Sequence, residues 1–278
     1  MAAWVIGLVL VGAGVFGVGG TAVACGPDTD CIVAGGTYRV RPPAGWDGRS
    51  PLPAAVFFHG WQDSAAGVMA DARLGQALSD KGVLLAAPNG IKGDWAFPGL
   101  PPVPGMPVPR RDDVAFVDAV LADLQDRFPI DRARLWATGF SIGGSMVWYE
   151  ACERGHAFAA FAPIAGAFWK PMPTRCPSGP VNLSHIHGLT DAMVPLEGRE
   201  PEPGFVQGDV FAAMALLRET DGCSSAPTRF GNDGPLVCRI WDGCTSGRVL
   251  RMCLHPYEHD MRPPWILDAW EWVQSLPR

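Results

Sequence analysis

Residues 138–143 read Thr138-Gly139-Phe140-Ser141-Ile142-Gly143 and contain the pattern Gly-x-Ser-x-Gly. The preceding residues 133–137 are typical of a short buried strand, and residues 145–152 are typical of the beginning of a helix. A serine on a sharp turn between a strand and a helix is exposed, and its flanking glycines are needed because a Cβ atom there would clash with neighbouring backbone. The stretch therefore predicts a strand–turn–helix unit that presents Ser141 as a nucleophile.

Strand-like and helix-like segments alternate along the rest of the chain. Such alternation predicts an α/β fold with a mostly parallel central sheet and helices on both faces. Asp112 and Asp113 begin one of the helices, where we expect capping and structural pairing rather than catalysis. The expected strands cover residues 54–58, 83–87, 133–137, 181–187 and 248–254, and the clearest expected helices cover residues 112–128 and 264–276.

A catalytic serine needs a base that takes its proton and a carboxylate that orients the base. When the nucleophile lies in a Gly-x-Ser-x-Gly turn, the chain order is serine, acid, histidine. Asp191 lies just past the expected strand 181–187, and His259 lies between the last expected strand and the last helix. We expect Asp191 to be the acid and His259 to be the base, with His255 as the competing base.

Two backbone N–H groups are expected to bind the oxyanion that forms during acyl transfer. One is the N–H of Ile142, the residue after the nucleophile. The other is expected in the loop His59-Gly60-Trp61-Gln62, which follows the strand 54–58. Trp61 is the predicted donor and Gln62 the alternative, while His59 is expected to hold the loop in place.

Several short motifs together resemble one group of enzymes, the secreted polyhydroxybutyrate-depolymerase-like esterases, which are related to the feruloyl and acetylxylan esterases of carbohydrate esterase family one. The resemblance covers roughly residues 38–276. It implies an α/β-hydrolase fold, a metal-free and cofactor-free serine esterase, and the triad Ser141, Asp191 and His259. The motifs are His59-Gly60, Asp112-Asp113-Val114, Gly139-Phe-Ser-Ile-Gly-Gly144, His187-Gly-Leu-Thr-Asp191 and His259.

The chain departs from the family around the predicted base. Tyr257 and Glu258 stand where the family usually has small glycines, and residues 260–263 replace the Trp-Pro that often follows the histidine. We expect Tyr257 and Gln62 to contact substrate. Trp95 is a further candidate, as a platform for an aromatic or sugar group, with a packed core tryptophan as the alternative.

Composition and charge limit the classes of function. The chain has 278 residues, of which 48% are hydrophobic and 18% charged, so it can bury one large core. We expect one catalytic domain over residues 25–278, as a monomer. The formal net charge is −6 and no long basic run is present, which argues against nucleic acid as a partner.

Residues 1–24 are predicted to be a signal peptide. The segment is apolar and uncharged from residue 3 to residue 20, and Ala22-Val23-Ala24 has the small-x-small pattern of a cleavage site. Cleavage would leave Cys25 first. We therefore expect a secreted or periplasmic protein without stable membrane association, with a lipoprotein anchored at Cys25 and an uncleaved anchor as alternatives.

Eight cysteines support export, because an even number in an oxidising compartment indicates disulfides. Proximity suggests Cys25–Cys31. Analogy with the resembling family suggests Cys152–Cys176 and Cys223–Cys244, which leaves Cys238–Cys253. No Cys-x-x-Cys pair is present, and His185 and His187 lack a third ligand at suitable spacing, so we expect no metal site.

The most specific interpretation is a secreted serine esterase that acts through an acyl-enzyme. Its expected substrates are feruloyl or acetyl esters of polysaccharides, or short polyesters of the hydroxyalkanoate type. Two alternatives stay open at this point. One is a serine peptidase or acyltransferase on the same scaffold, and the other is a non-catalytic secreted binding protein with a decayed site.

Overall fold

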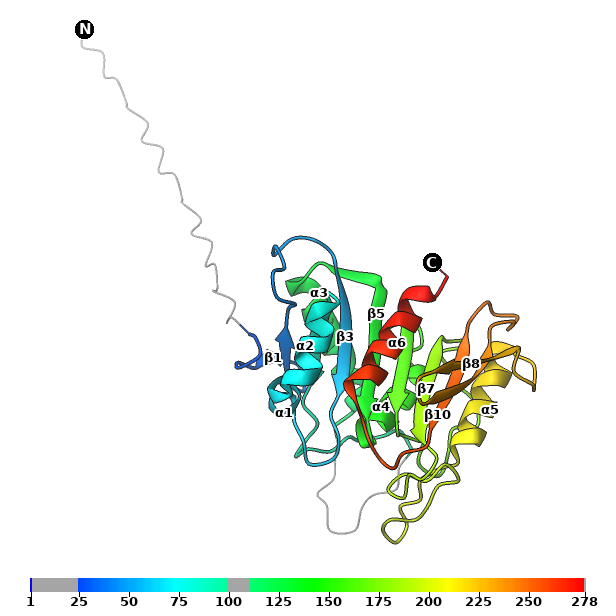
Figure 1. Cartoon of the computed structure of the whole chain (residues 1–278). Coiled ribbons are helices and arrows are strands. Elements are labelled where there is room, and N and C mark those ends of the chain that lie inside the picture. The colour runs from blue at the N-terminus through cyan, green and yellow to red at the C-terminus, as the bar shows by residue number, and fades with distance from the viewer. Residues whose placement is uncertain (2–24, 100–110, 278) are drawn as a thin grey trace.

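Ten strands form one sheet in the computed structural model, which describes residues 1, 25–99 and 111–277 (Figure 1). The strand order is β1-β2-β4-β3-β5-β6-β7-β10-β9-β8. The predicted signal peptide lies outside the described residues except for Met1. The strands are β1 (Cys31–Val33), β2 (Gly36–Arg41), β3 (Leu52–Phe58), β4 (Leu84–Pro88), β5 (Ile130–Phe140), β6 (Ala160–Ile164), β7 (Leu183–Gly188), β8 (Arg229–Asp233), β9 (Leu236–Trp241) and β10 (Leu250–His255).

The centre of the sheet is parallel and its edges are antiparallel. Strands β4, β3, β5, β6, β7 and β10 pair in parallel, in that order. The edge pairs β1–β2, β2–β4, β10–β9 and β9–β8 are antiparallel. The predicted mostly parallel sheet is therefore confirmed, and the carboxyl ends of six neighbouring strands meet at one edge.

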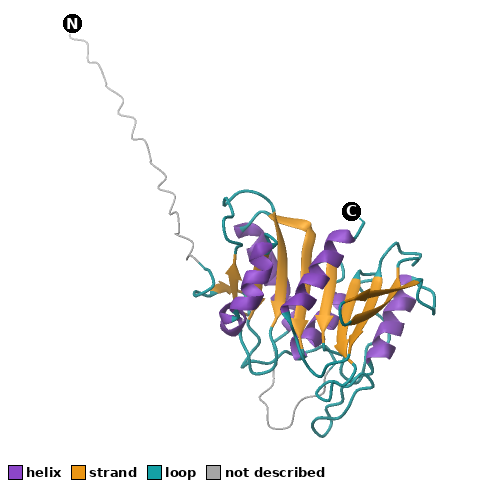
Figure 2. Cartoon of the chain, viewed as in Figure 1, coloured by secondary structure: helices purple, strands orange, loops and turns teal. Residues whose placement is uncertain are grey.

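Helices cover both faces of this sheet (Figure 2). Residues of β3 alternate between two cores: Val56 and Phe58 pack with α3 and α4, whereas Ala55 and Phe57 pack with α1, α2 and α6. This alternation follows from the two-residue period of a strand. The helices are α1 (Ala65–Ala70), α2 (Ala72–Asp80), α3 (Asp113–Arg127), α4 (Ile142–Glu153), α5 (Val210–Asp221) and α6 (Pro263–Ser275).

Aspartates cap the N-termini of helices α2, α3 and α5. Asp112 caps α3 by accepting a hydrogen bond from the N–H of Ala115, as the sequence predicts. Asp113 is buried and pairs with the Arg111 guanidinium, and it also accepts the N–H of Ala96 at 2.5 Å. The structural role predicted for the two aspartates is consistent with these contacts.

Four disulfides are present, and they include all eight cysteines. The expected pairs Cys25–Cys31, Cys152–Cys176, Cys223–Cys244 and Cys238–Cys253 are all confirmed. The last pair joins β9 and β10 at residues that face each other in the antiparallel register. Within the described part of the chain, we find no helix long and apolar enough to cross a membrane.

Candidate active site

Ser141 lies on the turn between β5 and α4 in a strained backbone conformation, with φ of 59° and ψ of −123°. The adjacent glycines make this turn feasible. A Cβ atom on Gly139 would lie 2.7 Å from the Phe58 carbonyl oxygen, and one on Gly143 would lie 2.5 Å from the His59 carbonyl oxygen. The nucleophile turn is thus packed directly against the end of β3, which carries the predicted oxyanion loop.

Asp191 and His259 come together although 68 residues separate them. His259 Nδ1 lies 2.7 Å from Asp191 Oδ2, and the N–H groups of Met193 and Val194 donate to Asp191 Oδ1 at 2.9 and 2.8 Å. The His259 ring also packs on Phe140, the residue before the nucleophile, with ring centroids 4.6 Å apart. These contacts gather the predicted acid and base at the nucleophile turn.

The loops that carry the two residues are held together by their backbones. Strands β7 and β10 are parallel neighbours, and beyond them the Leu189 N–H donates to the His255 carbonyl at 2.8 Å. Gly188 ends β7, and a Cβ atom there would lie 2.5 Å from the Glu258 carbonyl oxygen. The missing side chain at Gly188 therefore lets the His259 loop cross over the end of β7.

His255, the competing base, lies in a different environment. It is buried, and its ring stacks on Trp265 at a centroid distance of 4.0 Å. Burial, with a smaller contribution from His187, lowers the pKa of His255 to about 4. Asp191 is hydrogen-bonded to His259 rather than to His255, so the geometry favours His259 as the base.

Asp191 is held as a carboxylate although it is buried. Burial alone would raise its pKa, but hydrogen bonding from His187, His259 and the Val194 N–H outweighs burial, and the pKa of Asp191 falls below its ordinary value. The group is therefore ionised at neutral pH and can stabilise a cationic His259 ring.

The loop after β3 is fixed by its own histidine. His59 Nε2 accepts the Gly90 N–H at 2.9 Å, and this leaves Nδ1 to donate to the Gly60 carbonyl at 2.8 Å. Within the described residues the Trp61 N–H has no acceptor, and the Ile142 N–H is the first amide of α4, which has no partner inside the helix. Both amides predicted to bind the oxyanion are thus available to a ligand.

Gln62 is not the alternative donor, and this expectation is corrected. Its N–H donates to the Gly93 carbonyl at 2.8 Å, so it is already used within the protein. Gln62 has a positive φ of 60°, and Gly93, with φ of 77°, packs against its backbone. The Gln62 side chain is exposed, and its predicted contact with substrate stays a prediction.

No family model matches the sequence, but curated relatives do. Feruloyl esterase C of Emericella nidulans is 32% identical over 125 residues, which are 44% of this chain and 41% of that protein. Putative esterase NocK of Nocardia uniformis is 33% identical over 181 residues, 63% of this chain and 51% of that protein. The chain thus spans about half the length, or less, of these relatives.

Solved structures of esterases have the same fold. An acetyl xylan esterase from Aspergillus awamori superimposes with a TM-score of 0.62 at 12% identity, covering 86% of this chain and 94% of that one. A thermostable esterase gives a TM-score of 0.57 at 20% identity, covering 87% and 59%. The chain therefore has the α/β-hydrolase fold and is similar in sequence to feruloyl esterases. The resemblance and the fold inferred from the sequence are confirmed.

Trp95 is not a substrate platform, which corrects the expectation. Its side chain is only 1% exposed, because it packs against Phe58 and His59 and donates its indole N–H to the His59 carbonyl at 3.0 Å. It therefore supports the loop that carries Trp61, whose own side chain is 66% exposed. The alternative of a packed core tryptophan is the one the structure supports.

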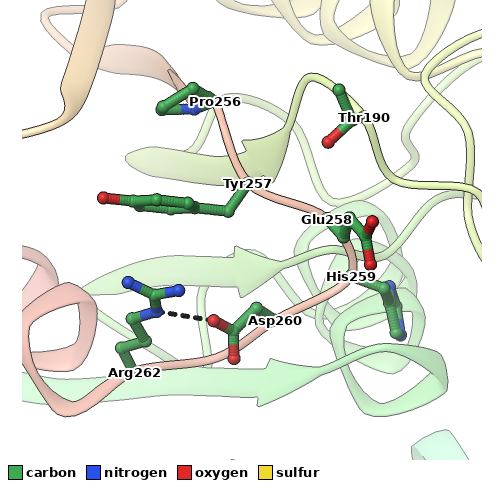
Figure 3. Close-up of a pocket in the computed structure, with 7 residues that line it drawn as sticks. All are labelled: Thr190, Pro256, Tyr257, Glu258, His259, Asp260 and Arg262. Carbon is green, nitrogen blue, oxygen red and sulfur yellow. Dashed lines mark hydrogen bonds and ion pairs between the residues drawn. The ribbon is translucent and has the colours of Figure 1, made fainter.

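A cavity of about 470 Å³ opens beside His259 (Figure 3). Tyr257 contributes to its wall, but the Tyr257 ring points away from His259 and lies 4.0 Å from the Arg262 guanidinium. Arg262 is in turn paired with Asp260 at 2.5 Å. Contact of Tyr257 with a ligand stays a prediction. The residues that line the cavity are Thr190, Pro256, Tyr257, Glu258, His259, Asp260 and Arg262.

His187 is the site residue that sequence reasoning missed. From the sequence it is considered as a metal ligand and that role is rejected, yet its Nε2 lies 3.4 Å from Asp191 Oδ2. The feature of the sequence that could have indicated this contact is the position of His187 at the end of an expected strand, four residues before the acid. That spacing is uninformative until the turn folds the acid back onto the strand end.

Proposed function

We propose that this chain is a carboxylic ester hydrolase that forms an acyl-enzyme on Ser141, with His259 as base and Asp191 as the orienting acid. The observation that carries the proposal is the 2.7 Å contact between His259 Nδ1 and Asp191 Oδ2, next to the strained turn of Ser141. Similarity to named esterases supports the same conclusion.

Acyl transfer would proceed in two steps at this site. Ser141 Oγ attacks the ester carbonyl carbon while His259 Nε2 takes its proton, and the Asp191 carboxylate stabilises the imidazolium that forms. The N–H groups of Ile142 and Trp61 bind the oxyanion, and His259 then returns the proton to the departing alkoxide. Water attacks the acyl-enzyme in the second step, with His259 again as base.

The similar proteins include a feruloyl esterase and an acetyl xylan esterase, and these suggest the substrate class. We propose feruloyl or acetyl esters of polysaccharides as substrates, with short hydroxyalkanoate polyesters as a further possibility of the same chemistry. The cavity beside His259 offers space for part of such an ester. An acyltransferase or a peptidase would need the same triad, and no feature of the described residues favours either one.

We further propose that the protein acts outside the cytoplasm, in secreted or periplasmic form and as a monomer. Four disulfides support this location, because such bonds persist in oxidising compartments. The monomer proposal rests on the sequence alone.

The test is ester hydrolysis by the purified oxidised protein. Methyl ferulate, an acetylated xylan and a soluble hydroxybutyrate oligomer are compared in parallel. Ser141→Ala should lower turnover by a factor on the order of 10⁴–10⁶, because the nucleophile is lost. Ser145→Ala, four residues further along α4, is the matched control and should keep most of the activity.

The outcomes separate the candidate functions. Serine-dependent release of ferulate, acetate or hydroxybutyrate would assign the acyl group. A wild-type protein that neither cleaves an ester faster than Ser141→Ala nor reacts with a fluorophosphonate probe would contradict the proposal and favour a binding protein with a decayed site.

A further inference from the structure

Two fully buried histidines lie in a row behind the proposed catalytic acid. His185 and His187 both belong to β7, and their side chains are on the same face of the sheet because two residues separate them. His185 Nε2 lies 2.8 Å from His187 Nδ1, and His187 Nε2 lies 2.7 Å from the Val194 carbonyl oxygen. The acyl-transfer mechanism described above uses neither ring.

The position of the proton on His187 follows from its neighbours. Nε2 faces two acceptors, the Val194 carbonyl at 2.7 Å and Asp191 Oδ2 at 3.4 Å. It must therefore carry a hydrogen whether the ring is neutral or cationic. His185 is fully buried, and burial holds its pKa well below the ordinary value, so this ring is neutral.

His187 acts on Asp191 by two routes. Its N–H edge lies beside Oδ2, the oxygen that also contacts His259. It also holds the carbonyl of Val194, whose own N–H donates to Asp191 Oδ1 at 2.8 Å. One imidazole thus stabilises the charge of the carboxylate and fixes the turn of residues 191–194 around it.

We propose that His187 is a positioning residue that holds the Asp191 carboxylate ionised and oriented toward His259, and that His185 supports it from behind. This inference rests on the proposed function, because it assigns a role within the same triad. The mechanism needs a fixed imidazole tautomer on His259 and a carboxylate that stays charged while buried. His187 meets both needs from inside the core.

The surroundings of the pair contain few other charges. His255 of β10 and the loop residues Asp260 and Arg262 interact electrostatically with one another, and His255 also interacts with His187 and Asp191. On the side of α4, the uncharged Trp148 ring packs on His185 at 5.2 Å. Substitution of His187 therefore alters mainly the hydrogen bonding of Asp191.

The kinetic test compares His187→Leu with His187→Gln. Leucine removes the N–H donor, so we expect kcat to fall by about 10- to 100-fold with a much smaller change in KM, since the triad is misaligned while the substrate site is intact. Glutamine places an N–H near the position of Nε2 and should restore most of kcat. Ser184→Ala, on the same strand but facing Arg251, is the control for general destabilisation.

The pH–rate profile distinguishes positioning from a purely structural role. A carboxylate that loses a hydrogen-bond donor accepts a proton more readily, so we expect the acid limb of kcat/KM to move to higher pH. We expect this shift in His187→Leu and not in Ser184→Ala. An acid limb and a kcat equal to those of the wild type in folded His187→Leu would overturn the proposal.

A measurement on the wild-type protein tests the proposal even if His187→Leu does not fold. Nitrogen-15 spectra of the histidine rings should show a bound proton on His187 Nε2 throughout pH 5–9, and an unprotonated Nε2 would overturn the proposal. Absence of Ser141-dependent hydrolysis in the wild type would overturn the proposed function and this role with it. An active wild type with an unaffected His187→Leu would overturn only the role of His187.

Discussion

Single residues at the site combine strain with close packing. Ser141 has a positive φ that few non-glycine residues adopt, and neighbouring glycines let the backbone of residues 58–59 and 164–166 approach this turn. Asp191 is buried, yet several N–H groups keep it ionised. Each of these arrangements is unfavourable in isolation and is stabilised only by the surrounding fold.

At Asp221, in contrast to Asp191, burial outweighs hydrogen bonding and raises the pKa of the carboxyl group. It is 1% exposed, its Oδ1 accepts the Val181 N–H at 3.2 Å, and Oδ2 has no hydrogen-bond partner among the described residues. Burial raises its pKa to about 7, above the roughly 3.9 of an unfolded chain. The folded state therefore binds a proton that the unfolded state releases, and stability falls as the pH rises from about 4 to about 7.

Asp221→Asn should remove this loss of stability, because the amide is neutral and its oxygen can still accept the Val181 N–H. We expect the variant to gain on the order of 2–4 kcal/mol over the wild type at pH 8, and much less at pH 4.5. Urea unfolding of both proteins at the two pH values measures the difference. An equal difference at both values would show that Asp221 is not held neutral.

Among the elements, β7 and β10 decide where the acid and the base meet. They are parallel neighbours, so their carboxyl ends lie at the same edge of the sheet and their following loops run side by side. Gly188, the last residue of β7, lies beneath the backbone of Tyr257 and Glu258. His259 therefore lies against Asp191 because β7 and β10 are in register and because Gly188 has no Cβ atom.

Gly188→Ala should displace the His259 loop, because the new Cβ would collide with two carbonyl oxygens that belong to rigid backbone. We expect kcat for an ester substrate to fall at least about 10-fold, since a displacement of 1 Å in a triad is costly. Gly26→Ala is the control, because a Cβ there meets nothing within 4 Å. Equal activity of the two variants would mean that the loop tolerates the side chain.

At the scale of the molecule, one sheet unites segments that are distant in sequence, and four disulfides join segments that are 6 to 24 residues apart. The sheet places the ends of β3, β5, β7 and β10 at one edge, and the site residues described above lie at or after these ends or after the adjacent β4. The disulfides connect mainly the periphery: Cys152–Cys176 ties the end of α4 to the loop before β7. Such bonds stabilise mostly by restricting the unfolded chain.

Removal of Cys152–Cys176 by the double substitution Cys152→Ala and Cys176→Ala should cost about 3 kcal/mol of unfolding free energy. The bond joins residues 24 apart in sequence, whereas Cys25–Cys31 joins residues only 6 apart, so its loss should exceed that of the matched Cys25→Ala and Cys31→Ala variant by about 1 kcal/mol. Guanidinium unfolding measures both. The opposite ranking would contradict the entropic argument.

The sequence by itself determined the features that depend on near neighbours. The Gly-x-Ser-x-Gly turn, the alternation of strands and helices, the cap at Asp112 and the disulfide-forming cysteines all follow from local sterics, periodicity and composition. Chain order and family resemblance added Asp191 and His259 as candidates, and the structure brings these two into contact.

Only the tertiary structure decided what surrounds each side chain. Burial of Trp95 and use of the Gln62 N–H by Gly93 depend on segments that pack together without any local signal. The contact of His187 with Asp191 depends on how the turn after β7 folds back onto the strand end. The physical reason is that a side chain's exposure and hydrogen-bond partners are set by the close packing of distant segments, whereas a turn or a strand is set by its own residues.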